Sequence, residues 1–543
     1  MNDILRRGLG GETSPAAGSA PTLATQPSVR GATVALLRAL GMTTVFGNPG
    51  STELPMFREF PEDFRYVLGL QESIVVGMAD GFAQATRNAA FVNLHSAVGV
   101  GHAMGNIFTA FKNQTPLVIT AGQQARSILP YEPFLFSAQA TELPKPYVKW
   151  SCEPARAEDV PAAIARAYYT AMQPPQGPTL VSVPVDDWDR AGSPLEVRRV
   201  SRRTLGDPEM LVRAAQQLAA ARRPAFVVGA SVSRDDAWDE VIALAERHQA
   251  AVFVSPLSAR CSFPENHALF MGFLPASREQ IVAALAGFDV VAVLGAPVFT
   301  YHVEGFGPHA PPGTTLVHLT DDPSQAHFAP VGTSVFTSLK LGIQELLKGP
   351  APVARSAPAR LRRPAAVPAS RLTDAFLLQQ IAKQRPRGSI IVEEAPSSRG
   401  PMHDHLPIVE RDTFYTCASG GLGHGLPAAV GVSLGRPGER VIAVLGDGSS
   451  LYAIQGLWNA AQLRLPMTFI IVNNQRYEAL ENFGRHFGLD RTVGTRIPDV
   501  DFCGLASAQG LKAMRVERAA ALETALDEAF VASEPVLVEV RVE

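Results

Sequence analysis

Two apolar runs joined by one helix-length segment, in residues 440–477, constrain the fold of this chain more than any other feature. The sequence there is RVIAVLGDGSSLYAIQGLWNAAQLRLPMTFIIVNNQRY. The first run ends in a Gly-Asp-Gly turn at 446–448, the second ends in an Asn-Asn pair at 473–474, and the residues between have the apolar spacing of a helix. This pattern predicts one β-α-β unit, whose right-handed crossover brings both strand ends to one edge of a parallel sheet.

The same alternation of strands and helices recurs along the chain. A first series starts at residue 31 and includes a predicted helix in VALLRAL, a helix from Glu72, and strands in TTVFG, FRYVLGL, AFVNL and PLVITAG. A second series starts near RPAFVVGA, and a third runs from SIIVEE to PVLVEVRV. Because 543 residues exceed what one hydrophobic core supports, we predict an α/β protein with three doubly wound parallel-sheet domains.

Changes in composition mark the boundaries between these domains. A stretch rich in Pro and Ala, GPAPVARSAPARLRRPAAVPAS, has no strand pattern and is typical of a linker. The N-terminal segment is rich in Gly, Ala, Ser, Thr and Pro and lacks the apolar region of a signal peptide. The predicted parts are a flexible tail at 1–28, a first domain at 29–198, a central domain at 205–345, the linker at 346–372 and a third domain at 373–543.

Charge and cysteine content exclude several classes of function. The 48 basic and 51 acidic residues give a formal net charge of -3 without a basic stripe, which disfavours nucleic-acid and membrane-surface partners. No apolar run reaches the roughly 18 residues of a membrane span. The four cysteines form no CxxC pair, so neither a zinc site nor a disulfide framework is indicated. We therefore expect a soluble, cytoplasmic protein.

The strand ends of the β-α-β unit carry side chains suited to a metal and a phosphate. Asp447 and Asn474 can converge there, and a carboxylate, an amide oxygen and a nearby backbone carbonyl are hard ligands that suit Mg²⁺ or Ca²⁺. Gly446 and Gly448 let the backbone approach a diphosphate, and the amide of Ser449 lies at a helix N-terminus, where anions are favoured. An ordinary crossover with a Gly-Asp-Gly turn is the alternative interpretation.

The segment resembles the thiamine-diphosphate motif, in which GDG is followed at this distance by NN. Five further segments, GNPGSTELP, LQES, NLHSAVG, GAPVFTYH and CASGGLGHGLPAA, occur in the order and at the separations found in benzoylformate decarboxylases. The resemblance that these segments carry extends over nearly everything from residue 31 to residue 543. The chain thus resembles the thiamine-diphosphate-dependent 2-keto acid decarboxylases, closest to the benzoylformate decarboxylases.

This resemblance implies a role for a specific set of residues. The catalytic residues would be Ser51, Glu72, His95 and His302. Thiamine diphosphate would be bound by Glu72, Asn48, Gly50, Gly420, Leu422, Gly446, Asp447, Gly448, Ser449, Asn474 and Tyr477, and the metal by Asp447, Asn474 and the carbonyl of Arg476. The substrate pocket would be lined by Phe134, Leu135, Thr416, Ala479, Leu480 and Phe483. Taken singly, each has an ordinary structural interpretation, such as a first-turn acid for Glu72 or a surface histidine for His302.

The resemblance also implies the reaction. A 2-keto acid would be decarboxylated without oxidation, through a thiamine ylid and an enamine, to an aldehyde and CO₂. Glu72 would act on the cofactor's pyrimidine ring, His95 and His302 would transfer protons, and Ser51 would bind the substrate carboxylate. Because the expected pocket is apolar and partly aromatic, benzoylformate is the first choice of substrate, as in mandelate and other aromatic catabolism. The family implies a dimer or a homotetramer.

Three alternatives stay open at this stage. One is a decarboxylase of phenylpyruvate or another 2-keto acid. A second is a carboligating synthase resembling acetohydroxyacid synthase, whose central domain binds FAD, but GASVSRDD lacks a GxGxxG fingerprint and no FAD is expected. A third is a catalytically silent binding protein on the same scaffold, against which the intact Glu72, Asp447 and Asn474 argue.

Overall fold

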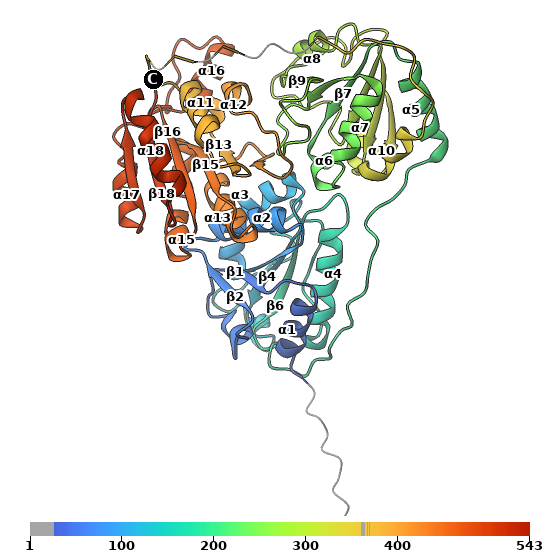
Figure 1. Ribbon diagram of the computed structural model, residues 1–543. Coiled ribbons are helices and arrows are strands. Elements are labelled where there is room, and N and C mark those ends of the chain that lie inside the picture. The colour runs from blue at the N-terminus through green and yellow to red at the C-terminus, as the bar shows by residue number, and fades with distance from the viewer. Residues whose placement is uncertain (1–26, 360–363, 366, 369) are drawn as a thin grey trace, which may run out of the picture.

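Three six-stranded parallel sheets form three lobes in a computed structural model of the protein (Figure 1). The structure describes residues 27–359, 364–365, 367–368 and 370–543. The predicted fold class is confirmed. Residues 1–26 of the expected tail, and 360–363, 366 and 369 of the expected linker, lie outside the described residues.

The first lobe, at the bottom of Figure 1, has the strand order β2-β1-β3-β4-β6-β5. Its strands are β1 (Thr44–Gly47), β2 (Arg65–Leu68), β3 (Ala90–Leu94), β4 (Leu117–Gln123), β5 (Ser151–Cys152) and β6 (Pro178–Pro184). Its α-helices are α1 (Val29–Ala39), α2 (Glu72–Thr86), α3 (Ser96–Asn113) and α4 (Val160–Met172), with 3-10 turns at Leu54–Phe57, Leu129–Tyr131 and Ala157–Asp159.

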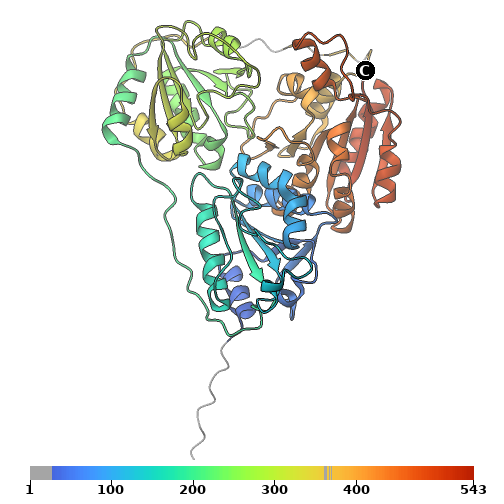
Figure 2. The ribbon, with the colours of Figure 1, turned by 180° about the vertical axis from the view of Figure 1, so that it is seen from behind.

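The central lobe has the strand order β12-β11-β10-β7-β8-β9. Its strands are β7 (Pro224–Val228), β8 (Ala251–Val254), β9 (Phe270–Phe273), β10 (Val290–Leu294), β11 (Thr315–Thr320) and β12 (Thr333–Phe336). Its helices are α5 (Pro208–Ala220), α6 (Ala230–Arg234), α7 (Trp238–His248), α8 (Arg278–Ala284), α9 (Pro323–Phe328) and α10 (Leu339–Leu347). An extended segment after β6 leads into this lobe along the outside of the molecule (Figure 2).

The third lobe has the strand order β14-β13-β15-β16-β18-β17. Its strands are β13 (Ile390–Glu394), β14 (Phe414–Thr416), β15 (Val441–Gly446), β16 (Met467–Asn473), β17 (Lys512–Val516) and β18 (Val536–Arg541). Its helices are α11 (Asp374–Gln384), α12 (Arg399–His405), α13 (Gly425–Gly435), α14 (Asp447–Leu451), α15 (Gly456–Gln462), α16 (Glu478–His486), α17 (Phe502–Ala508) and α18 (Ala519–Val531), and a 3-10 turn spans Pro396–Ser398.

The β-α-β unit predicted from the sequence is present, with one difference. Strands β15 and β16 pair in parallel, with Gly446 opposite Val472. The connection is not one helix but two short ones, α14 and α15, separated by a turn. The break sets a five-residue helix directly after β15, so the Gly-Asp-Gly segment forms the start of α14.

The first and third lobes share one hydrophobic core, which includes Ile74 from the first and Leu426 from the third. Helices α2 and α13 cross at small residues. A Cβ atom added to Gly81 would lie 2.1 Å from the carbonyl oxygen of Ala428, so only glycine permits this close approach. The buried His424 of the third lobe also pairs with the buried Asp80 of α2.

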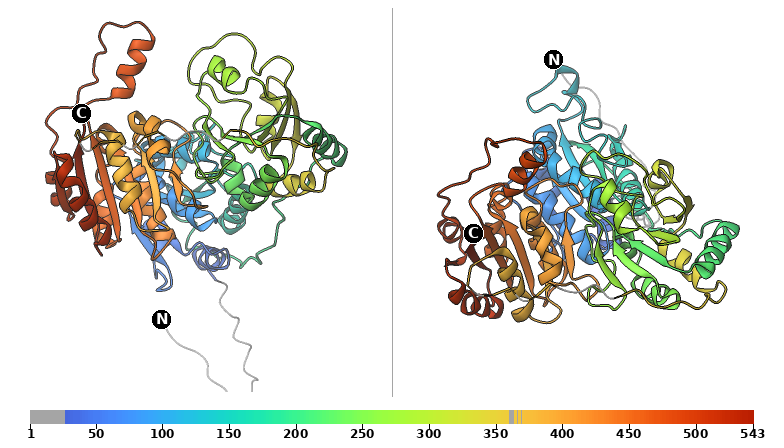
Figure 3. Two further views of the ribbon diagram at one scale, coloured as in Figure 1. Left: turned by 45° about the horizontal axis from the view of Figure 1, so that its top comes forward. Right: turned by 90° about the horizontal axis from the view of Figure 1, so that it is seen from above.

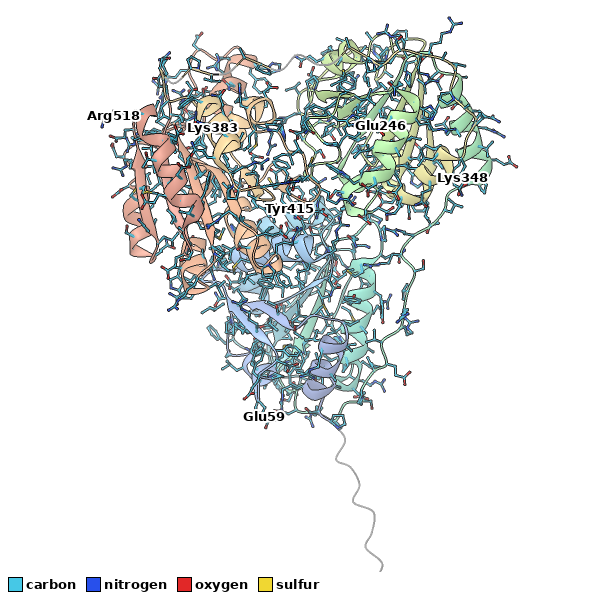
Figure 4. The ribbon with its side chains drawn as sticks, viewed as in Figure 1. Glu59, Glu246, Lys348, Lys383, Tyr415 and Arg518 are labelled. Atoms are coloured by element: carbon cyan, nitrogen blue, oxygen red, sulfur yellow. The ribbon has the colours of Figure 1, made fainter. Side chains whose placement is uncertain are left out.

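Tyr415 lies where the three lobes meet (Figure 4). Its ring is buried, and the guanidinium of Arg260 from the central lobe stacks over it at 4.9 Å from the ring centroid. Arg260 is itself close to Asp412 of the third lobe, at 3.6 Å. Arg260 also donates to the carbonyl oxygen of Gln84 in the first lobe at 3.4 Å, so it ties the central lobe to the other two.

Across the part of the chain that the structure describes, no helix combines the length and the apolar character needed to cross a membrane.

Candidate active site

The ends of β15 and β16 bring Asp447 and Asn474 together, as the crossover predicts. Asp447 Oδ2 and Asn474 Oδ1 both accept the backbone N–H of Arg476, each at 3.2 Å. Asp447 Oδ1 accepts the N–H of Gly448 at 2.6 Å. The two side-chain oxygens therefore converge on one corner of the sheet edge.

Asp447 is a buried carboxylate that forms no ion pair with any other residue that the structure describes. It is 4% exposed, and burial raises the pKa of its carboxyl group. Among the described residues no group of three or more His, Cys, Asp and Glu side chains could hold a metal. A donor set of one carboxylate, one amide oxygen and one backbone carbonyl suits a hard cation such as Mg²⁺, which completes its shell with phosphate oxygens and water.

A cavity of about 510 Å³ opens from this corner. Most of the expected cofactor-binding and substrate residues of the third lobe line it, together with His302 of the central lobe. The lining residues named in the sequence analysis are His302, Gly420, Leu422, Gly446, Asp447, Gly448, Ser449, Asn474, Arg476, Tyr477, Ala479, Leu480 and Phe483.

Glycines keep the floor of this cavity open. A Cβ atom on Gly448 would lie 2.2 Å from the ring of Tyr477, and Gly420 has a φ of +72°, which strains other residues. Apart from Gly420 and its two chain neighbours, no atom of the described residues lies within 4 Å of a Cβ built on Gly420. These positions leave the room and the backbone amides that a diphosphate needs, so the residues present fit thiamine diphosphate.

One wall of the cavity is apolar. Leu480 and Phe483 come from α16, which stands on an arm away from the sheet (Figure 3). The imidazole of His302 packs edge-on against Phe483, with ring centroids 4.6 Å apart. The backbone N–H of His302 donates to the carbonyl oxygen of Ala276, which fixes this segment of the central lobe. A titratable group thus faces an aromatic wall.

Thr416 is not among the lining residues of this cavity. Its hydroxyl donates to Glu393 Oε2 at 2.7 Å, and Arg399 donates to its oxygen at 3.1 Å. It lines a separate cavity of about 500 Å³ between the central and third lobes. The hydrogen bond to a fully buried carboxylate explains this position.

The expected residues of the first lobe form a second group. Glu72 begins α2, because the side chain of Gln71 caps the helix by accepting the N–H groups of Ser73 and Ile74. Glu72 is 8% exposed. Its Oε2 accepts a hydrogen bond from His102 Nδ1 at 3.1 Å.

His95 lies at the end of β3, beside the turn that contains Asn48, Gly50 and Ser51. Its Nδ1 donates to Glu53 Oε2 at 2.8 Å, and the same oxygen accepts the N–H of Gly50. A Cβ atom on Gly50 would lie 2.1 Å from His95 Nδ1, so glycine is required for this turn to approach the imidazole. The carboxylate fixes the ring and leaves Nε2 for proton transfer.

Phe134 and Leu135 lie in a loop beside His95. The hydroxyl of Ser96 donates to the carbonyl oxygen of Leu135, and the amide of Gln124 donates to that of Phe134. The Phe134 residue is nevertheless 87% exposed. None of the described residues that line the 510 Å³ cavity belongs to the first lobe, so one chain carries two separate half-sites.

Comparison with known proteins matches this geometry. Three family models cover the lobes in turn: the N-terminal TPP binding domain of thiamine pyrophosphate enzymes at 28–141, the central domain at 211–346 and the C-terminal TPP binding domain at 397–540. The chain is 43% identical over 519 residues to the benzoylformate decarboxylase of Pseudomonas aeruginosa, which covers 94% of this chain and 98% of that protein. The chain belongs to the thiamine-diphosphate-dependent 2-keto acid decarboxylases.

Solved structures of these decarboxylases have the same fold. The benzoylformate decarboxylase of Polynucleobacter necessarius superposes with a TM-score of 0.93 at 39% identity, covering 95% of this chain and 98% of that one. The 4-hydroxybenzoylformate decarboxylase of Rhodococcus jostii RHA1 superposes with a TM-score of 0.92 at 40% identity, covering 95% of this chain and 99% of that one. An acetolactate synthase of Arthrospira platensis is more distant, 26% identical over 542 residues, 93% of this chain and 92% of that protein.

Three of the residues that sequence reasoning missed lie beside expected site residues of this decarboxylase family member. Glu53 holds His95, His102 holds Glu72, and Tyr452 lines the cavity. A signal existed for one of them, because Glu53 follows Gly50 within the same turn.

Proposed function

We propose that this protein decarboxylates an aromatic 2-keto acid, with benzoylformate as the first choice, to the aldehyde and CO₂. One observation carries the proposal: a single cavity joins the Asp447–Asn474 corner to the apolar wall of Leu480 and Phe483. The activities named for the relatives from Pseudomonas aeruginosa and Rhodococcus jostii support it.

Thiamine diphosphate and Mg²⁺, or Ca²⁺, are the proposed cofactors. Asp447, Asn474 and the carbonyl of Arg476 would hold the metal, and the Gly446–Ser449 backbone would hold the diphosphate. When bound, thiamine diphosphate supplies a carbon nucleophile and an electron sink for decarboxylation. Leu422, which lines the cavity, would contact the bound cofactor.

The chain's own residues would then bind the substrate and handle protons. Glu72 would hydrogen-bond the cofactor's pyrimidine, and Ser51 would bind the substrate carboxylate. His95 and His302 would transfer protons, because imidazole changes its charge near neutral pH. Phe134, Leu135, Ala479, Leu480 and Phe483 would surround the aryl group, while the hydroxyl of Thr416 is engaged with Glu393.

We expect a kcat/KM for benzoylformate about a hundredfold above that for pyruvate, because burying a phenyl ring contributes roughly 2 to 3 kcal/mol more than burying a methyl group. Phenylpyruvate is the second choice. CO₂ release with added thiamine diphosphate and Mg²⁺ measures kcat/KM for benzoylformate, phenylpyruvate and pyruvate. Phe483→Ala should reduce the ratio of kcat/KM for benzoylformate to kcat/KM for pyruvate. Phe328→Ala, at an exposed position on α9 of the central lobe, should leave this ratio unchanged.

Equal turnover of pyruvate would contradict the aryl assignment. A yellow chromophore that is released as flavin, together with carboligation of pyruvate, would instead favour the synthase. Gly229 and the five-residue helix α6 follow the first central strand in this chain, and the fingerprint GxGxxG is absent there.

The two half-sites support self-association as a dimer or a homotetramer. Glu72 and His95 belong to a group that the 510 Å³ cavity of the same chain does not include. The 87% exposed Phe134 also needs a cover if it is to contact a substrate. We therefore propose that the first lobe of one chain completes the cavity of another.

Complementation tests this sharing. Chains with Glu72→Gln and chains with Asp447→Ala each lose one half-site, so each homodimer should be inactive. Co-expression should restore about a quarter of the wild-type activity, because random pairing makes half of the dimers mixed and each mixed dimer keeps one intact site. If the mixture stays inactive although size-exclusion and native mass spectrometry detect the mixed dimer, the site lies within one chain.

The remaining proposals concern boundaries and location. The family-model matches at 28–141, 211–346 and 397–540 support the expected domains at 29–198, 205–345 and 373–543. The four free cysteines of the described residues support a reducing cytoplasm.

A further inference from the structure

A stripe of three residues on α3 faces the start of α2. Gly99, His102 and Asn106 are spaced by one helical turn each, so they lie on the same face. Asn106 donates to the backbone carbonyl of Ser73 at 2.7 Å and to its hydroxyl at 3.0 Å. The first turn of α2 is therefore held by α3 as well as by its own cap.

The side chain of Glu72 occupies this stripe. Its Oε2 accepts the N–H of His102 Nδ1 at 3.1 Å. A Cβ atom added to Gly99 would lie 3.3 Å from Glu72 Oε1, so the missing side chain makes room for the carboxyl group. Among the described residues no side chain hydrogen-bonds to Oε1, which leaves that oxygen for an outside partner.

The exposure of the pair argues against a role in stability. The side chain of Glu72 is 11% exposed, whereas that of His102 is 58% exposed. A hydrogen-bonded pair with one exposed partner contributes little to folding, because water competes for the exposed imidazole. A histidine that reaches across from a neighbouring helix to one oxygen of a carboxyl group instead restricts how that group can rotate.

We infer that His102 is a positioning residue, which holds Glu72 through Oε2 so that Oε1 is presented to the cofactor. This inference rests on the proposed function. His102 acts through Glu72 and touches neither substrate nor cofactor. The N–H at Nδ1 carries the effect, since that nitrogen makes the contact.

Substitutions that mimic one or the other ring nitrogen of His102 distinguish the effect of its hydrogen bond from the effect of its size. The amide nitrogen of Asn lies near the position of His Nδ1, whereas that of Gln lies near Nε2. We expect His102→Ala and His102→Gln to slow the exchange of the cofactor's C2 proton for deuterium about tenfold, as expected for a displaced catalytic group. His102→Asn should stay within about threefold of wild type.

A double-mutant cycle tests whether His102 works through Glu72. In a Glu72→Gln background, His102→Ala should change the exchange rate less than about twofold, because the group it positions is already disabled. His327→Ala, on an exposed part of the central lobe, is the matched control and should change nothing. Equal effects of His102→Ala in both backgrounds would overturn the inference.

Two readouts are independent of catalysis. In the cofactor-free chain labelled with ¹³C at the Glu carboxyl carbons, the resonance that Glu72→Gln removes should move in His102→Ala and move less in His102→Asn. The affinity for thiamine diphosphate should fall in His102→Ala without a change in thermal stability of the cofactor-free chain. The positioning role is refuted if His102→Ala exchanges at the wild-type rate, or if His102→Asn exchanges as slowly as His102→Ala. The proposed function itself is refuted if the unmodified chain binds no thiamine diphosphate.

Discussion

Asp447→Ala should abolish cofactor binding and reduce decarboxylation by a factor of at least about a thousand, because the metal loses its one charged protein ligand. Asp447 is 4% exposed, and two backbone N–H groups, of Gly448 and Arg476, donate to its carboxylate. The substitution therefore also leaves these donors without their acceptor. Retained thiamine diphosphate, measured after gel filtration, and CO₂ release check the result.

The control for this change is Asp490→Ala, which removes an exposed carboxylate from the same lobe and should leave binding and activity unchanged. Prolonged chelation followed by gel filtration should reproduce the loss in wild type, and added Mg²⁺ should reverse it. Activity that survives both the substitution and complete removal of metal would remove Asp447 from the proposed site.

The fold followed from the sequence because strand and helix patterns are local. The predicted strands AFVNL and SIIVEE correspond to β3 and β13, and the predicted helix from Glu72 begins at that residue. The break between α14 and α15 was not predicted. Apolar spacing runs on through the turn at 452–455, so periodicity alone does not reveal it.

The convergence of Asp447 and Asn474 was also predictable, because topology alone places the ends of adjacent parallel strands together. Partners across helices were not. The pairs Glu53–His95 and Glu72–His102 join residues 42 and 30 positions apart on different elements, and they depend on which rotamers meet between those elements.

Thr416 illustrates how a matched position can have a different environment. The resemblance placed it in the substrate pocket, yet its hydroxyl is bound to Glu393, next to Arg399. This bond gives a donor to a carboxylate that would be costly to bury without one, and contact of Thr416 with the substrate stays a prediction. The sequence around Thr416 does not reveal these hydrogen bonds, because they depend on Glu393 and Arg399 lying next to Thr416 in the fold.

Glu72→Gln should slow the exchange of the cofactor's C2 proton by about a hundredfold or more, the usual effect of removing a positioned acid or base. The amide keeps the size of the side chain but has no exchangeable acid proton to share with the pyrimidine ring. Since Glu72 is 8% exposed and His102 donates to its Oε2, the glutamine can retain one acceptor there, and the fold should be preserved.

The measurement is NMR of the cofactor after quenching in deuterium oxide, with thermal unfolding as the test of the fold. Glu59→Gln changes an exposed carboxyl group at the far end of the first lobe (Figure 4) and should exchange as wild type does. Because the cofactor would have to lose this proton before it reacts with substrate, the rate of benzoylformate decarboxylation should also fall in Glu72→Gln. Unchanged exchange in Glu72→Gln would reduce Glu72 to an acidic residue that stabilises the first turn of α2 through the helix dipole.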